Sequence, residues 1–336
     1  MESRMGKNFC VALSIVLASA SAYSHHSASA FDLDRVLEFQ GTVVKYRWRN
    51  PHVYIVVRDE NDIEWTVESD AIAVLSRSNW SRDSFNIGDS VSVRANPDKS
   101  ATKKHALLLS IVGPNGVSMA SMKRTDQSNV PSIPVTASSL AGVWTSERAQ
   151  TRSLRRAFKN HPLTEKGQLA KAEFEESMNP TAECVSFPTP FIMAMNSVYL
   201  IEVELREDEI QLRSEFYDTT RTVYMDGRKH PQNGNRTNQG HSIGWWEEGT
   251  LVIDTTQFAD HRSAIPNLGV PSGSKKHVIE RLTLSEDGSR VVIRILMNDP
   301  EYFSEPISTV FAWSYAPNLA MDTVDCDPEV ARFFLE

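Results

Sequence analysis

The stretch GHSIGWWEEGTLVIDTTQF, residues 240–258, decides how the second half of the chain folds. Its two parts, 241–247 and 250–258, are rich in β-branched and aromatic residues, and the intervening EG at 248–249 has the composition of a tight turn. We therefore expect a β-hairpin. The letters GHSIG also have the spacing of a hydrolase nucleophile motif, but that motif requires a strand followed by a helix. A hydrolase is not expected, because the chain continues as a hairpin.

Similar strand patterns surround this hairpin. They lie at 197–205, 209–216, 220–225, 276–284, 290–297 and 307–315, with hairpin turns between several of them. One helix is expected over 163–177, with Thr164 as its N-cap. The Gly-x-Trp at 142–144, on an opening strand, is typical of lipocalin-like barrels. The sequence predicts an antiparallel lipocalin-like β-barrel, or a strongly curved sheet, with a short helix over residues 139–336.

The first half of the chain has a different order of elements. Strand patterns lie at 36–48, 52–59, 63–69, 90–95 and 105–113, and a short helical pattern lies at 71–78. Five strands with one helix after the third is the order of an OB-fold, so we expect an OB-like five-stranded barrel over 25–113. Residues 114–138 are rich in Ser, Pro and Thr, which is typical of a flexible linker. The chain as a whole is expected to be mainly β.

The first residues have the pattern of a secretory signal peptide. Arg4 and Lys7 precede a short apolar stretch at 9–20, and small residues fit cleavage after Ala22 or Ser24. No stretch of the chain is long and apolar enough for a membrane-spanning helix. We expect a signal peptide at 1–24 and a periplasmic or secreted protein. The net charge of −8 argues against a nucleic-acid partner, because phosphate binding requires a basic surface.

Two of the three cysteines remain in the mature chain. Cys10 lies in the signal peptide, which leaves Cys184 and Cys326. An even pair in an oxidising compartment predicts a disulfide. It would close a long loop and contribute about 4–5 kcal/mol in the chain-entropy model.

Two groups of motifs carry a resemblance to known families. HHS at 25–27, FD at 31–32 and GTVVKYRWRNPH at 41–52 resemble a family of secreted bacterial domains of unknown function. YMDGRKHP at 224–231, the stretch at 240–258 and KHVIERL at 276–282 resemble a second uncharacterised bacterial domain, with the patterns DGR-x-HP, GHSIG-x-WE and DTT-x-F. The resemblances imply export and this architecture, and no established activity.

The histidines that follow the signal peptide suggest a metal site. Cleavage after Ser24 would make His25 the first residue, so that its α-amine and ring would both be available. With one more histidine they form a three-nitrogen site that suits Cu(II). His25 or His26 would start this site, and His52 or His105 would complete it. The alternative is a solvated tip without a role. No other metal motif is present, so no cofactor is required and copper is possible.

Alternation along the predicted strands groups the polar residues of the second barrel. Glu280 shares a face with Val278 and Leu282, so an inward orientation would bury its carboxylate. Burial would raise the pKa of this group and suit it to act as a general acid, unless Arg221 or Arg228 forms a structural ion pair with it. His241 shares a face with Trp245, which would line a cavity if that face points inward.

The candidate site residues follow from these patterns. Glu280, His241 and Asp254 are the candidate proton donors and acceptors. The candidate ligand-binding residues are Arg221, Tyr224, Asp226, Arg228, His230, Trp245, Trp246, His261, His277 and Arg281. Ordinary structural roles are the alternative: a tight turn at Asp226, packing of the tryptophans, and local backbone hydrogen bonds at Asp254.

We expect an exported protein that binds a small, mostly apolar ligand in the C-terminal barrel. One alternative is an acid–base enzyme without a cofactor, such as an isomerase, hydratase or cyclase, in which the three candidate residues converge on one point of the cavity. A second alternative is copper binding through the N-terminal histidine.

Overall fold

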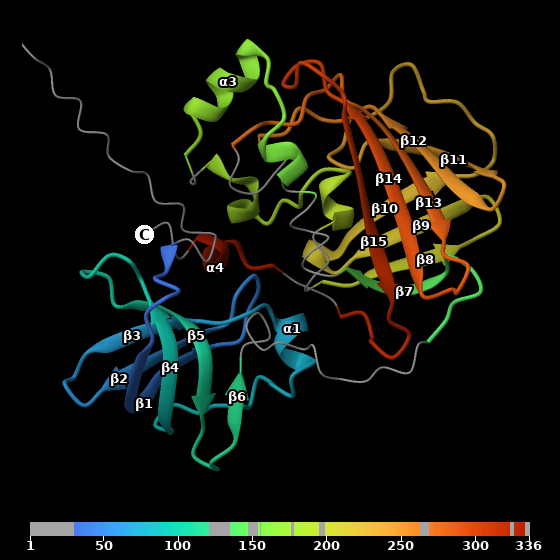
Figure 1. Cartoon of the computed structure of the whole chain (residues 1–336). Helices are drawn as coiled ribbons and strands as arrows, with labels where there is room; N and C mark the ends of the chain where they lie inside the picture. Colours follow the sequence, from blue (N-terminus) through green and yellow to red (C-terminus); the bar gives the residue numbers. More distant parts are fainter. Residues whose placement is uncertain are drawn as a thin grey trace, which may run out of the picture.

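The computed structural model describes residues 30–120, 135–146, 154, 156–175, 178–194, 199–262, 269–322 and 326–332. Figure 1 shows two β-rich bodies, the first formed by β1–β6 and the second by β7–β15. The predicted fold class, mainly β with an OB-like barrel followed by a second barrel, is confirmed. The predicted signal peptide at 1–24 and the histidines His25 and His26 lie outside the described residues.

The first barrel has the strand order of an OB-fold. β1 pairs with β2 and β4, β2 pairs with β3, and β5 closes the ring by pairing antiparallel with β4 and parallel with β3. A short helix follows the third strand, as predicted. The elements are β1 (Leu37–Arg47), β2 (Tyr54–Asp59), β3 (Glu64–Glu68), α1 (Ile72–Ser76), β4 (Ser90–Pro97), β5 (His105–Val112) and β6 (Ser118–Ala120).

Alternating burial along these strands forms the core of the first barrel. On β4, Val91 and Val93 are buried, whereas Ser92 and Arg94 between and after them are exposed. β1 and β2 approach each other closely at Gly41, where a Cβ would collide with the carbonyl oxygen of Arg58. β6 pairs with β5 and lies inside the segment predicted as a linker; residues 121–134 of that segment are outside the described part.

The second barrel is closed by nine strands of the described chain. The order around the ring is β10-β11-β12-β13-β14-β15-β7-β8-β9, and β9 pairs with β10. The strands are β7 (Gly142–Ser146), β8 (Ile201–Leu205), β9 (Glu209–Ser214), β10 (Thr219–Tyr224), β11 (His241–Glu247), β12 (Thr250–Thr256), β13 (His277–Leu284), β14 (Arg290–Asn298) and β15 (Ile307–Tyr315). The hairpin expected at 240–258 is present as β11 and β12, in the register His241 opposite Thr256.

One pairing departs from the antiparallel pattern. β10 and β11 run parallel, with Val223 opposite Ser242 and Tyr224 opposite Ile243. A parallel pair cannot be joined by a tight hairpin, so the chain from 225 to 240 forms a long connection between them. This connection carries the MDGRKHP motif, and its position next to the ends of two strands places the motif over the outer face of the barrel.

The segment between β7 and β8 fills one part of the barrel. It contains α3 (Glu165–Ala172), η3 (Pro180–Glu183) and η4 (Phe191–Ala194). All residues of η4 are buried, and the indole Nε1 of Trp313 donates to the Met193 carbonyl at 2.9 Å. The predicted cap of α3 is confirmed, since the Thr164 hydroxyl accepts from the Gly167 amide at 3.1 Å. Much of the space that an empty barrel would offer to a ligand is therefore occupied by η4 and its neighbours.

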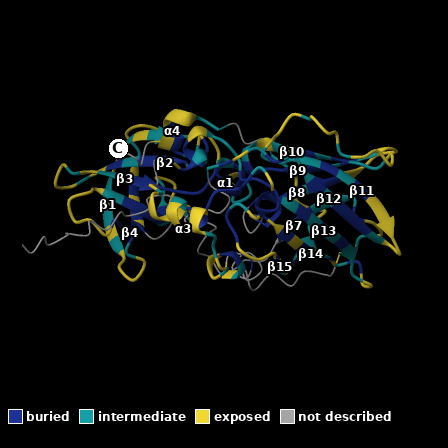
Figure 2. Cartoon of the chain, turned by 90° about the horizontal axis from the view of Figure 1, so that it is seen from above, coloured by how far each residue is buried: buried dark blue, intermediate teal, exposed yellow. Residues whose placement is uncertain are grey.

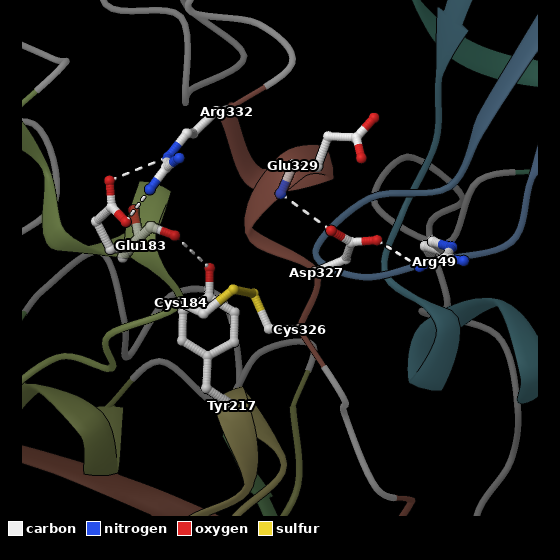
Figure 3. Close-up of a disulfide and its surroundings, with 9 residues drawn as sticks. Arg49, Glu183, Cys184, Tyr217, Cys326, Asp327, Glu329 and Arg332 are labelled. Carbon is white, nitrogen blue, oxygen red and sulfur yellow. Dashed lines mark hydrogen bonds and ion pairs between the residues drawn. A yellow bond between two sulfur atoms is a disulfide. The ribbon is translucent and has the colours of Figure 1, made fainter.

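The predicted disulfide between Cys184 and Cys326 is present (Figure 3). It attaches the segment that leads to α4 (Pro328–Arg332) to the second barrel, next to η3. The same segment contacts the first barrel, where the Arg49 guanidinium donates to the Asp327 carboxylate at 2.5 Å (Figure 3). On the other side, Arg332 forms an ion pair with Glu183. The C-terminal segment therefore connects the two barrels.

A buried ion pair also joins the barrels. Arg77, directly after α1, donates to both carboxylate oxygens of Glu215 at 2.9 and 3.1 Å, and Glu215 is fully buried. The backbone amides of Leu200 and Asp322 donate to the same carboxylate. α1 and the residue before it contribute Val74 and Ala71 to the core of the second barrel. The two barrels thus share packing as well as the chain between them.

No helix within the described part of the chain is long and apolar enough to cross a membrane.

Candidate functional site

The predicted polar residues of the second barrel divide between two faces of the same strands. On β13, Glu280 is buried together with Val278 and Leu282, which confirms that they share a face. The cross-strand register places Thr255 of β12 and Ser242 of β11 on this inner face. His241, Asp254 and His277 occupy alternate positions and lie on the outer face.

The inner residues form a dry hydrogen-bonded network around Arg221. Its Nε donates to the Ser242 hydroxyl at 2.9 Å, and its Nη2 donates to Thr255 Oγ1 at 2.7 Å and Glu280 Oε2 at 2.5 Å. Arg221 and Glu280 are 3% and 1% exposed, so the pair is excluded from water. Arg221 is the partner of Glu280, and Arg228 is not. Nη1 of Arg221 has no hydrogen-bond partner among the described residues.

The expected convergence of Glu280 with His241 and Asp254 is not found. Side chains of a strand alternate between its faces, and the closed barrel places Glu280 inside and the other two outside. The face of His241 and Trp245 does not line a cavity, because it is the outer one. An acid–base site built from these three residues together is therefore ruled out by the geometry.

Four outer residues form a continuous chain of contacts, which we call the histidine chain: His277, Asp254, His230 and His241. His277 Nε2 lies 2.8 Å from Asp254 Oδ1, and His230 Nε2 lies 3.3 Å from the same oxygen. The other ring nitrogen of His230, Nδ1, lies 2.9 Å from His241 Nδ1. The side chains of His230, Asp254 and His277 are 20%, 23% and 44% exposed, so the chain is accessible to solvent.

The long connection between β10 and β11 brings further predicted residues to this chain. The rings of Tyr224 and His241 stack with their centroids 5.2 Å apart, and the Arg228 guanidinium lies 3.9 Å from the centroid of the Tyr224 ring. Arg228 also pairs with Asp226, and this hydrogen-bonded guanidinium holds the pKa of the Asp226 carboxyl below its usual value. The turn at Asp226 thus positions Arg228 over the tyrosine.

The environment of His241 favours its neutral form. Burial lowers the pKa of its imidazole, and the nearby His230 and Arg228 lower it further. A half-buried neutral imidazole beside a second imidazole and a carboxylate can accept and pass on a proton. This is the main chemical capacity of the histidine chain.

The remaining predicted residues lie apart from the histidine chain or at its edge. Trp245 and Trp246 are 40% and 48% exposed, and the Trp245 indole donates to Glu247 at 2.6 Å. Arg281 also pairs with Glu247. His261 is buried and pairs through its backbone with Ser272. Figure 2 shows the exposed end of β11 that carries the tryptophans.

Sequence reasoning missed Lys276, which is 2% exposed and lies one position before His277. Its Nζ donates to the Thr189 carbonyl and the Ser272 hydroxyl, both at 2.6 Å. Burial lowers its pKa to about 7. No signal in the sequence distinguishes this lysine from its exposed neighbour Lys275. Ser242 and Thr255 were not among the candidate residues either, although they alternate with His241 and Asp254 and so share the inner face with Glu280.

A second group of titratable residues lies in the first barrel, where β3 ends and β5 begins. His52 Nδ1 lies 3.6 Å and His105 Nε2 lies 3.4 Å from the two oxygens of the buried Glu68 carboxylate. The Phe31 ring packs edge-on against His105, with centroids 4.9 Å apart. The two histidines that were expected to complete a copper site, His52 and His105, therefore lie at the same carboxylate, close to where the described chain begins. Within the described ranges, no group of three or more His, Cys, Asp or Glu side chains is arranged to hold a metal ion.

One family model and several solved structures are similar to parts of this chain. Residues 13–107 match the model of a family of unknown function (DUF6152). No curated protein matches the chain. A solved crystal structure, that of a point mutant of the fluorescent protein UnaG, aligns with 52% of this chain and 95% of its own, at 10% identity and a TM-score of 0.27. A likeness of that degree carries no argument about ligand or function. The comparisons support an uncharacterised domain in the N-terminal part of the chain.

Proposed function

We propose that this is an exported protein whose C-terminal barrel binds a small ligand on its outer face, at the histidine chain. The observation that carries the proposal is the geometry of the histidine chain. Four titratable residues from a long connection and three strands converge in one hydrogen-bonded line and remain accessible to solvent. Partly exposed titratable groups that converge in this way, with the pKa of one of them, His241, lowered by its surroundings, are typical of functional sites.

The neighbours of the histidine chain define the ligand further. Ile243 and Ile279 lie on either side of Asp254 in the cross-strand register, and Leu296 follows Ile279 in the same row. Leu296 is 49% exposed and adds an apolar side chain to the outer face. A ligand with an apolar body and one polar end would cover this row and place its polar end at the histidines.

The site lies on the barrel and not in it, unlike the site expected from the sequence. The interior at the level of Glu280 holds the Arg221 network, and much of the rest is filled by side chains of η4 and the strands. A buried ion pair that is hydrogen bonded on several sides is a structural feature more than a ligand site.

Binding can be tested with a library of small aromatic and carbonyl compounds, followed by ligand-detected NMR and titration calorimetry. We expect at least one binder with Kd below about 1 mM, and at least tenfold weaker binding to His241→Asn. The matched control is His161→Gln, because His161 lies on the same barrel and contacts the Glu305 carbonyl. Equal binding to wild type and His241→Asn, or no binder in the library, would overturn the proposal.

Export can be tested separately by the mass of the protein recovered from the exporting host. We expect a chain that begins at Tyr23 or His25, because small residues precede both cleavage points. Recovery of the chain with residues 1–22 intact would contradict export by this route.

Copper binding is a second candidate, and one contact favours it. His52 Nδ1 lies 3.1 Å from the Ser69 carbonyl oxygen, which can only accept a hydrogen bond. Nδ1 therefore carries the proton, and Nε2 has the lone pair that a metal ion requires. Phe31 lies against His105, so the six-residue segment back to His25 spans at most about 20 Å. An N-terminal His25 is thus within reach of both ring systems.

The copper test compares two forms of the mature protein. One begins at His25, and the other carries one extra residue ahead of it. We expect the first to bind about one Cu(II) with the electron paramagnetic resonance spectrum of a nitrogen-rich site, and the second and a His52→Gln variant to lose that spectrum. Identical spectra for all three forms would exclude this site.

A further inference from the structure

The order of hydrogen bonds along the histidine chain follows from its one carboxylate. An ionised carboxylate can only accept, so the nitrogen that faces Asp254 on His230, Nε2, carries a proton. A neutral His230 then has its lone pair on Nδ1, which faces His241 Nδ1 at 2.9 Å. His241 must donate from Nδ1, which leaves the lone pair of His241 on Nε2.

We propose that Asp254, His230 and His241 form a proton relay, and that His241 Nε2 takes the proton of a phenolic hydroxyl on the bound ligand. This inference rests on the proposed function and names the chemical class of its ligand. The aromatic surroundings support a phenol: Tyr224 stacks on His241, and Trp245 lies two strand positions along the same outer face from Ile243.

The proton transfer requires no cofactor. The hydroxyl O–H bond breaks, its electron pair stays on the phenolate oxygen, and the proton forms an N–H bond at His241 Nε2. The Nδ1 proton of His241 then passes to His230 Nδ1, so the positive charge moves from His241 to His230. There it lies 3.3 Å from a carboxylate oxygen of Asp254.

The groups that face His241 fit this role. Tyr224 from β10 and His230 and Arg228 from the long connection surround the ring, and Thr256 lies opposite it on β12. Arg228 is the one permanent cation among these four residues, and it favours both a neutral His241 and a nearby phenolate. Asp254 contacts His230 and His277, and His230 lies between Asp254 and His241 in the order of contacts.

The order of protons can be read directly by ¹⁵N NMR of the histidine rings at pH 8, above the ordinary histidine pKa of about 6.5. We expect protonated Nε2 and bare Nδ1 on His230, and protonated Nδ1 and bare Nε2 on His241. In Asp254→Asn the amide can donate as well as accept, so His230 is no longer required to carry its proton on Nε2. The fraction of His241 rings with an unprotonated Nε2 should therefore fall. His161→Gln should leave both rings unchanged. A protonated His241 Nε2 in the wild type would overturn the relay.

Proton transfer to the relay can be tested with 4-cyanophenol at pH 7, where the free probe is mostly in its hydroxyl form. We expect binding to the wild type with the absorption band of the phenolate, and loss of that band in His241→Gln. Binding without a phenolate band would overturn the relay and leave the proposed binding site standing. Failure of the probe to bind would overturn the phenol as ligand class, and the library screen would then decide the proposed function alone.

Discussion

The inner and outer faces of β11, β12 and β13 carry similar types of polar residue in different environments. Neighbouring positions alternate between them: Ser242 after His241, and Thr255 after Asp254. On the inner face, hydrogen bonds hold the Arg221–Glu280 pair away from water. On the outer face, the histidine chain is partly exposed and can exchange protons with solvent or a ligand. Access to water, more than residue type, separates a structural polar network from a chemical one.

Removal of one partner of the inner pair is expected to have the largest effect on stability. Glu280→Gln leaves the Arg221 charge buried without its counterion, and we expect a loss of about 3–5 kcal/mol in the free energy of unfolding. Urea denaturation followed by tryptophan fluorescence measures this loss. Glu247→Gln is the control, because it breaks the exposed pair with Arg281, and exposed ion pairs contribute little to stability. Equal losses for the two variants would contradict the distinction between the faces.

Local patterns predicted much of the fold. Alternation and turn composition identified the β11–β12 hairpin, and the position of the helix after the third strand identified the OB order. The parallel pairing of β10 with β11 and the filling of the barrel by η4 depend on residues far apart in sequence, and no local pattern reports them. The ion pair between Arg77 and Glu215 was not predicted for the same reason.

The residues of the histidine chain were all among the predicted candidates, but their arrangement was not predicted. Alternation grouped Glu280 with Val278 and Leu282, and it grouped His241 with Trp245, but it does not say which face becomes the interior. Closure of the barrel decides which face of each strand becomes the interior. It separated Glu280 from His241 and Asp254, and the long connection added His230, which no strand pattern could have placed between them.

Two neighbouring lysines precede β13, and they differ in burial: Lys276 is buried and Lys275 is exposed. Burial lowers the folded-state pKa of Lys276 to about 7, well below the ordinary lysine value. The unfolded chain therefore binds more protons between about pH 7 and 10, and the unfolding free energy should rise with pH in this window. We expect a rise of about 2–3 kcal/mol from pH 7.5 to 9.5 relative to Lys276→Met.

The measurement is urea denaturation across that pH range for the wild type and both lysine variants. Lys275→Met should follow the wild-type curve, because the Lys275 side chain is exposed to water. A wild-type curve that is as flat as that of Lys276→Met would contradict the low pKa.

The smallest effect on stability is expected on the outer face. Asp254→Asn should lower the unfolding free energy by about 1 kcal/mol or less, because the contacts of Asp254 are partly exposed to water. Thermal unfolding measures this change, and the ¹⁵N spectra of the histidine rings measure the altered proton order in the same sample. A loss as large as that of Glu280→Gln would mean that the histidine chain is part of the structural core.

The disulfide has a mechanical consequence. If the chain is pulled from residues on either side of the bridge, the load passes through the sulfur atoms from Cys184 to Cys326 and bypasses the residues between them. β8–β15 all lie inside this covalent ring, whereas β7 and the entire first barrel lie outside it. Under tension, the first barrel and β7 would extend while the ring stays shielded. Reduction would then release the hidden length, since 142 positions separate the two cysteines and a residue spans at most about 3.6 Å, which together give roughly 500 Å.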